Sequence, residues 1–113
     1  MPVTDVAVQK FLERLGASRN ITSRKMFGGV GLYSDGVFFA VIDNDRLYFK
    51  VDDMNFPDYQ AFGMPQWVIE GANGGAMPYY EVPDQVLADS GKLGEWIDGA
   101  VGVALRKKGG RSR

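Results

Sequence analysis

Three glycines near residue 30 are the first residues whose spacing could do chemistry, because a glycine-rich backbone can approach and bind a phosphate. The segment 25–33 reads KMFGGVGLY and therefore contains a Gly-x-Gly. The dinucleotide-binding fingerprint G-x-G-x-x-G also needs a glycine three residues after this pair, and a helix whose N-terminus faces the pyrophosphate. Residues 34–36 instead have the composition of a turn, and residues 37–42 that of a β-strand. We interpret the glycines as a bulge or close packing in a sheet, with a ligand contact as the alternative.

Histidine and cysteine, which carry much of the chemistry near neutral pH, are both absent from the chain. Their absence removes the usual general base, the imidazole and thiolate metal ligands, and every Ser-His or Cys-His pair. It also excludes a disulfide framework, which is compatible with a reducing compartment. Catalysis would depend on carboxylates, lysines or a cofactor, so we predict a protein that is not an enzyme and uses no cofactor.

Acidic residues offer two weaker possibilities. Asp52, Asp53 and Asp58 are clustered as in a site for a hard metal ion, but they lack the spaced oxygen ligands of a calcium loop. We interpret them as solvated charges at the start of a helix. Glu70 and Glu81 would form a carboxylate pair only if neighbouring strands placed them together, and we expect two surface acids instead.

Charge is segregated along the 113 residues, although the net charge is only −1. Residues 1–34 have an excess of three basic residues, residues 35–105 an excess of nine acidic residues, and residues 106–113 carry five basic residues. A nucleic-acid-binding domain usually has a basic patch on its folded surface, so we interpret the terminal run as a solvated tail. The alternative is weak, nonspecific nucleic-acid binding through this run. The candidate nucleic-acid contacts are Arg106, Lys107, Lys108, Arg111 and Arg113.

The run from 24 to 51 has the pattern of three consecutive antiparallel strands with polar turns at 34–36 and 43–45. In the third strand, Leu47, Phe49 and Val51 alternate with more polar residues, which indicates a sheet covered on one face. We expect the polar set to face solvent or to bind a partner protein, including a second copy of the chain in a homodimer. This set consists of Arg46, Tyr48 and Lys50.

Two helices are predicted beside these strands. Thr4 can cap a first helix that ends at Gly16 and carries an apolar stripe for the core. The stripe consists of Val8, Phe11, Leu12 and Leu15. A short helix after the strands has Asn55 as its cap, Pro57 in its first turn and Gly63 at its end. The residues expected to pack it onto the sheet are Phe56, Tyr59 and Phe62.

A second hairpin and a long helix complete the predicted elements. Segments 66–70 and 77–82 form the hairpin around Asn73 and Gly74, with Pro78 marking an edge or a bulge. The helix begins near Asp89 and Ser90, and four glycines at 91, 94, 99 and 102 indicate close approach of its backbone to the sheet. We expect one core that joins both hairpins to the two long helices. The helix stripe consists of Leu93, Trp96, Ile97, Ala100, Ala104 and Leu105.

Within this order of elements the chain carries a set of short motifs: RKMFGG at 24–29, GLY at 31–33, LYFK at 47–50, YYEVP at 79–83, and Trp96 in the closing helix. In this combination the chain resembles the N-terminal domain of the TfoX/Sxy family. The resemblance covers about residues 10–108. The resemblance implies a two-layer α+β domain, with helices packed against a strongly bent antiparallel sheet in the order α-β-β-β-α-β-β-α. It implies no enzyme activity.

Full-length members of this family regulate natural competence, act with the cyclic-AMP receptor protein at promoters of DNA-uptake genes, and carry a second, helical domain. This chain ends after the first, so we expect a stand-alone domain over 1–108 with a flexible basic tail over 109–113. We expect a non-catalytic regulatory or protein-interaction domain whose partner is a transcription regulator, with small-ligand binding as the alternative. The N-terminus lacks a signal pattern and no apolar run approaches the ~20 residues needed to cross a bilayer, so we expect a cytoplasmic protein without a membrane partner.

Overall fold

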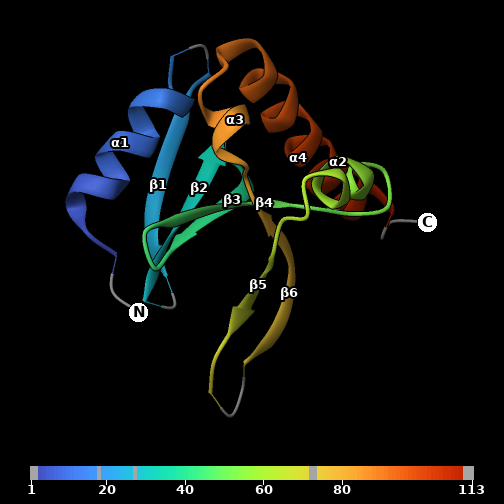
Figure 1. Cartoon of the computed structure of the whole chain (residues 1–113), viewed down its shortest axis with the longest axis horizontal. Helices are drawn as coiled ribbons and strands as arrows, with labels where there is room; N and C mark the ends of the chain where they lie inside the picture. Colours follow the sequence, from blue (N-terminus) through green and yellow to red (C-terminus); the bar gives the residue numbers. More distant parts are fainter. Residues whose placement is uncertain (1–2, 18, 27, 72–73, 111–113) are drawn as a thin grey trace.

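A computed structural model of the chain describes residues 3–17, 19–26, 28–71 and 74–110. Six strands form one antiparallel sheet in the order β1-β2-β3-β4-β6-β5, and α1 and α4 pack on one face of it (Figure 1). The predicted α+β class is confirmed. The strands are β1 Ile21–Met26, β2 Gly29–Ser34, β3 Val37–Asp43, β4 Arg46–Lys50, β5 Gln66–Ile69 and β6 Gly75–Glu81. The helices are α1 Asp5–Leu15, α2 Phe56–Ala61, α3 Asp84–Leu87 and α4 Ser90–Gly110.

The predicted order omits one strand and one helix. Segment 24–33, predicted as one strand, contains the turn between β1 and β2, where Gly28 has a φ of +77°. The middle of β1 is exposed throughout, so no alternation of apolar residues reveals this strand. Helix α3 has only four residues, too few to show a helical period. The interpretation of the glycines as a sheet feature is confirmed, because a Cβ on Gly31 would collide with Met26 Sδ and lie 3.0 Å from the Phe38 ring.

The ends of the long helices agree with the sequence predictions. Thr4 Oγ1 accepts a hydrogen bond from the Ala7 amide at 3.2 Å, and α1 ends at Gly16. The carboxylate of Asp89 accepts hydrogen bonds from the amides of Gly91 and Lys92, which fixes the start of α4. Helix α4 continues to residue 110, two residues beyond the expected boundary, and residues 111–113 lie outside the described residues.

Helix α2 begins where predicted, but its cap works differently. The Asn55 side chain makes no capping bond to the helix. Its Nδ2 donates to the Lys50 carbonyl at 3.1 Å and its Oδ1 accepts from the Asp52 amide at 2.9 Å, so it closes the loop between β4 and α2 instead. Phe62, expected on the sheet, is 41% exposed and contacts the Trp96 ring of α4.

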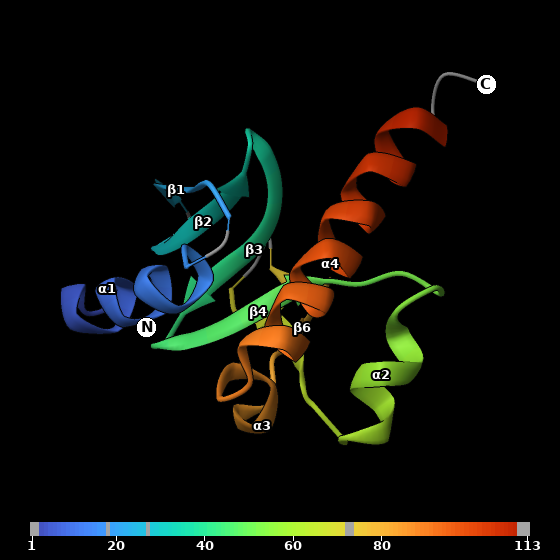
Figure 2. The same cartoon turned by 90° about the horizontal axis from the view of Figure 1, so that it is seen from above.

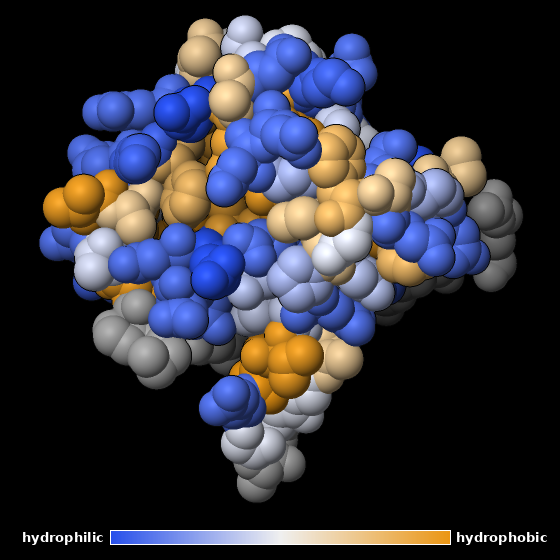
Figure 3. Space-filling model, viewed as in Figure 1, coloured by the Kyte–Doolittle hydropathy of each residue, from blue (hydrophilic) through white to orange (hydrophobic). Residues whose placement is uncertain are grey.

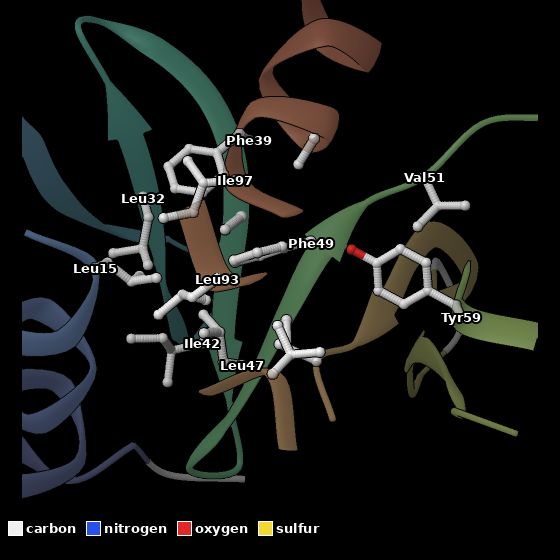
Figure 4. Packing of buried hydrophobic residues seen from close by; sticks show 14 of the residues in the cluster. Leu15, Leu32, Phe39, Ile42, Leu47, Phe49, Val51, Tyr59, Leu93 and Ile97 are labelled. Carbon is white, nitrogen blue, oxygen red and sulfur yellow. The ribbon is translucent and has the colours of Figure 1, made fainter. Parts of the chain in front are cut away.

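The main core lies between the sheet and the helices α1 and α4 (Figure 4). Leu15 from α1 and both Leu93 and Ile97 from α4 are buried there, against Phe39 and Phe49 of the sheet. Most of the predicted stripe of α4 is therefore confirmed. At its C-terminal end, however, Leu105 is 51% exposed and Val103 is buried in its place.

A second apolar cluster occupies the other face of the sheet, so the prediction of one joint core is wrong. Its buried members are Val41, Tyr48, Trp67 and Tyr79. Figure 1 shows the hairpin β5–β6 projecting from the body of the fold, and this hairpin supplies Trp67 and Tyr79. The indole Nε1 of Trp67 also donates to Asp43 Oδ2 at 2.9 Å, which ties the hairpin to the end of β3.

Of two local explanations, the one for Pro78 is correct in part and the one for the glycines of α4 is wrong. Pro78 does not lie at an edge, because β6 runs between β4 and β5; the register of β5 against β6 shifts between Gln66 and Val68, as expected for a bulge. The glycines of α4 do not mark close backbone approach. A Cβ on Gly94 or Gly102 would lie 3.3 Å from the guanidinium nitrogen of a flexible arginine, Arg19 or Arg106.

Tyr59 provides a first test of the core. Its hydroxyl points toward the core side chains in Figure 4 and has no hydrogen-bond partner among the described residues. Burial of an unpaired hydroxyl costs about 1–3 kcal/mol, so Tyr59→Phe should leave the free energy of unfolding unchanged or raise it by about 1 kcal/mol. Tyr59→Ala should lower it by about 3–5 kcal/mol. Urea denaturation measures both, and a clear loss of stability in Tyr59→Phe would contradict this account.

Tyr48 provides the matching test for the second cluster. It is 9% exposed, and its ring centroid lies 6.2 Å from that of Trp67. Tyr48→Glu would place a carboxylate in this apolar cluster and should lower the free energy of unfolding by about 3 kcal/mol or more. Tyr48→Phe, which keeps the ring, should cost less than about 1 kcal/mol. Equal denaturation midpoints for Tyr48→Glu and the wild type would show that this cluster does not stabilise the fold.

Candidate binding surfaces at the two ends of strand β4

The structure separates the three residues predicted to form a binding face on β4. Arg46 is exposed at the start of the strand, and Lys50 is partly buried at its end. Tyr48 lies between them in the second cluster, so the expectation that all three face solvent is wrong for Tyr48. The cause is the hairpin β5–β6, which covers this part of the sheet with aromatic rings that the local sequence of β4 does not indicate.

At the start of β4, Arg46 pairs with Glu81 of β6. Arg46 Nη1 lies 3.0 Å from Glu81 Oε2, and the side chain of Glu81 is only 15% exposed. The hydrogen bond and the charge of Glu81 raise the pKa of the Arg46 guanidinium. Glu70 lies just past β5, whose last residue Ile69 pairs with Gly75 at the opposite end of the hairpin. The carboxylate pair is therefore not formed, and Glu81 is not the surface acid expected.

An open groove of about 730 Å³ begins beside this ion pair. It runs between α1, the turn from β3 to β4, and α3. Figure 3 shows apolar surface, coloured orange, at the bottom of a hollow that hydrophilic side chains surround. Basic residues of the lining are Lys10, Arg14 and Arg46, and acidic residues are Asp45, Glu81 and Asp84. The groove thus combines an apolar floor with charges of both signs.

Hydrogen bonds between distant segments hold the walls of the groove in place. Asp45 Oδ1 accepts from the Thr4 amide at 2.8 Å, and Arg14 Nη1 donates to the Leu87 carbonyl at 2.8 Å. Lys10 and Asp84 form no ion pair among the described residues. Val6, on the same wall as Lys10, is 78% exposed despite its apolar side chain. The walls are fixed, while Lys10, Asp84 and the apolar side chain of Val6 remain available to a ligand.

A smaller hollow of about 300 Å³ lies at the other end of β4. Its lining residues are Lys50, Val51, Asp52, Val103, Arg106 and Lys107. Figure 2 shows α4 passing the end of β4, and the ion pair between Arg106 and Asp52 joins its C-terminal part to the segment after β4. The structure therefore brings together Lys50, predicted to bind a protein, with Arg106 and Lys107, predicted to contact nucleic acid.

Arg106 and Lys107 belong to α4 rather than to a flexible tail. Arg106 forms a bidentate ion pair with Asp52, with Nη2 3.0 Å from Oδ1 and Nε 3.2 Å from Oδ2. Asp52 is therefore not the purely solvated charge expected, since it also accepts a hydrogen bond from the Met54 amide. The side chain of Lys108 and the residues Arg111 and Arg113 lie outside the described residues. Nucleic-acid contact by this run stays a prediction.

Sequence reasoning missed most of the groove. The groove residues of α1 include Val6, Lys10 and Arg14, which recur every four residues and so share one side of the helix. Val6 lies outside the predicted apolar stripe of α1, and an apolar residue on the polar side of this helix is the one feature of the sequence that indicates the groove. Asp84 gave none, because α3 was not predicted.

Neither hollow has the arrangement of acidic side chains that a metal centre needs. Within the described ranges, no group of three or more Asp or Glu side chains is arranged to hold a metal ion. None of the helices in those ranges has the length and apolar character needed to cross a bilayer. What the two hollows offer is charged and apolar surface for binding.

Comparison with known proteins places this structure in a family. No match to the chain was found among curated proteins. A family model described as the TfoX N-terminal domain matches residues 13–104 of the 113 residues. The match begins within α1 and ends within α4, and it includes the whole sheet and both shorter helices. This chain therefore belongs to the TfoX N-terminal domain family.

Proposed function

We propose that this chain is a non-catalytic regulatory domain that acts by binding a segment of a partner protein in the groove between α1 and α3. The observation that carries this proposal is the pair of hydrogen bonds that hold the groove walls, from Thr4 to Asp45 and from Arg14 to Leu87. A groove that is already formed loses little conformational entropy when a ligand binds. Its volume, about 730 Å³, lies in the range typical of binding sites.

The lining of the groove indicates the chemistry of the bound segment. Lys10 and Asp84 come from opposite walls, and neither has an ion-pair partner among the described residues. A peptide that carries one acidic and one basic residue around an apolar side chain would pair with both and cover Val6. Charged pairs at the rim contribute mainly specificity and association rate, while the apolar contact contributes affinity.

Membership of the family supports a regulatory role and suggests the class of partner. Full-length members of this family act with a transcription regulator, the cyclic-AMP receptor protein. We therefore propose a transcription regulator as the partner of this chain. The absence of histidine and cysteine from the whole sequence favours binding over catalysis.

Val6→Glu tests the groove. The side chain is 78% exposed in the first turn of α1, where a glutamate is favourable to the helix, so the fold should be retained. A carboxylate at this apolar position should weaken partner binding by about tenfold, or about 1.4 kcal/mol. The matched control is Met54→Glu, which adds the same charge at a residue that is 74% exposed and lies outside the groove lining.

The measurement uses immobilised wild type and both variants to capture proteins from the native cytoplasm. A captured protein is accepted only if, once purified, it binds the wild type directly in isothermal titration calorimetry. Loss of this binding in Val6→Glu and its retention in Met54→Glu would support the groove as the docking site. Equal binding by all three proteins would exclude it.

A further inference from the structure

Among the described residues, no carboxylate pairs with the two lysines of the hollow at the end of β4. The one acid of this hollow, Asp52, is engaged by the bidentate pair with Arg106. Lys50 and Lys107 form no ion pair among the described residues, although they line the same space of about 300 Å³. The hollow therefore has an excess of two positive charges.

The lysine on β4 is held in position by aromatic rings. Lys50 Nζ lies 5.2 Å from the centroid of the Phe38 ring and 5.5 Å from that of Tyr79. Tyr79 is a buried member of the second cluster, only 4% exposed, and Phe38 packs against this cluster. These cation–π contacts restrict the Lys50 side chain, so the ammonium group is oriented before any ligand binds.

The positive charges that line the hollow favour the binding of an anion. Burial and the positive charge of Lys107 together lower the pKa of the Lys50 ammonium. An anion bound between the two lysines would relieve the repulsion between their charges. Val51 and Val103 supply the apolar part of the lining.

We propose that this hollow is a binding site for the phosphate group of a small ligand, held between Lys50 on β4 and Lys107 on α4. Two ammonium groups can donate to several oxygens of one phosphate by charge-assisted hydrogen bonds. The size of the hollow suits a phosphate or a diphosphate. The paired Arg106 and Asp52 form one wall and leave the two lysines as the ligand-binding groups.

A small ligand fits the surroundings of the hollow better than a nucleic acid does. A polyanion needs a row of cations along its backbone. Here Asp52 lies in the lining and Asp53 is exposed beside it, and residues 35–105 as a whole carry nine more acids than bases. A single phosphate is small enough to contact the two lysines without extending over the rest of this acidic surface.

Titration of the ¹⁵N-labelled full chain with pyrophosphate, followed by NMR, tests the proposal. Amide shifts should concentrate at residues 50–52 and 103–107. Lys107→Gln should weaken pyrophosphate binding by about fivefold or more, because one charge-assisted contact is lost. The matched control is Lys92→Gln, which removes the same charge from an exposed residue in the first turns of the same helix. It should leave the affinity unchanged.

A second readout separates a specific site from general attraction to a basic surface. The pKa of Lys50, measured from its ε-methylene signals, should rise when pyrophosphate binds and should also rise in Lys107→Gln without ligand. An equal loss of affinity in Lys107→Gln and Lys92→Gln would overturn the proposal. If a 20-nucleotide oligonucleotide bound at Lys50 and Lys107 while neither phosphate nor pyrophosphate bound, the phosphate-site proposal would be overturned in favour of a nucleic-acid contact.

Discussion

Strand β4 is covered on both faces, and the rest of the structure depends on this burial. Leu47 and Phe49 pack into the main core under the helices, while Tyr48 packs against Trp67 and Tyr79 on the opposite face. A strand buried on both sides must be closed by two layers of apolar residues. The helices supply one layer, and the hairpin β5–β6 supplies much of the other.

Because the middle of β4 is closed in this way, its polar residues are accessible only at the two ends. Each end has a similar arrangement, with one arginine paired to one carboxylate: Arg46 with Glu81 at the start, and Arg106 with Asp52 at the end. Both arginine side chains are largely exposed, and ion pairs in contact with solvent add little stability. Each pair lines a hollow with fixed groups, beside lysines that have no ion-pair partner among the described residues. The two candidate binding surfaces are thus consequences of one buried strand.

Local signals in the sequence predicted the elements whose caps and periods lie within a few residues. Thr4 and Gly16 delimit α1, and most of the apolar residues predicted at helical spacing in α4 pack in the main core. The apolar periodicity did not reveal α3, which is too short to show a helical period, or β1, which has no alternation of apolar residues. Sequence reasoning also misassigned Asn55, because the amide that this side chain binds belongs to the preceding loop rather than to the helix.

The sequence by itself determined the α+β class, the family and the residue types available for chemistry, since motifs, periodicity and the absence of histidine and cysteine require no coordinates. Only the tertiary structure decided where those residues meet. Arg46, Tyr48 and Lys50 alternate along one strand, yet the fold sends them to a groove, a core and a second hollow. The physical reason is that packing across the sheet joins residues far apart in the chain, such as Asp52 and Arg106. Alternation along a strand cannot specify which distant element covers it.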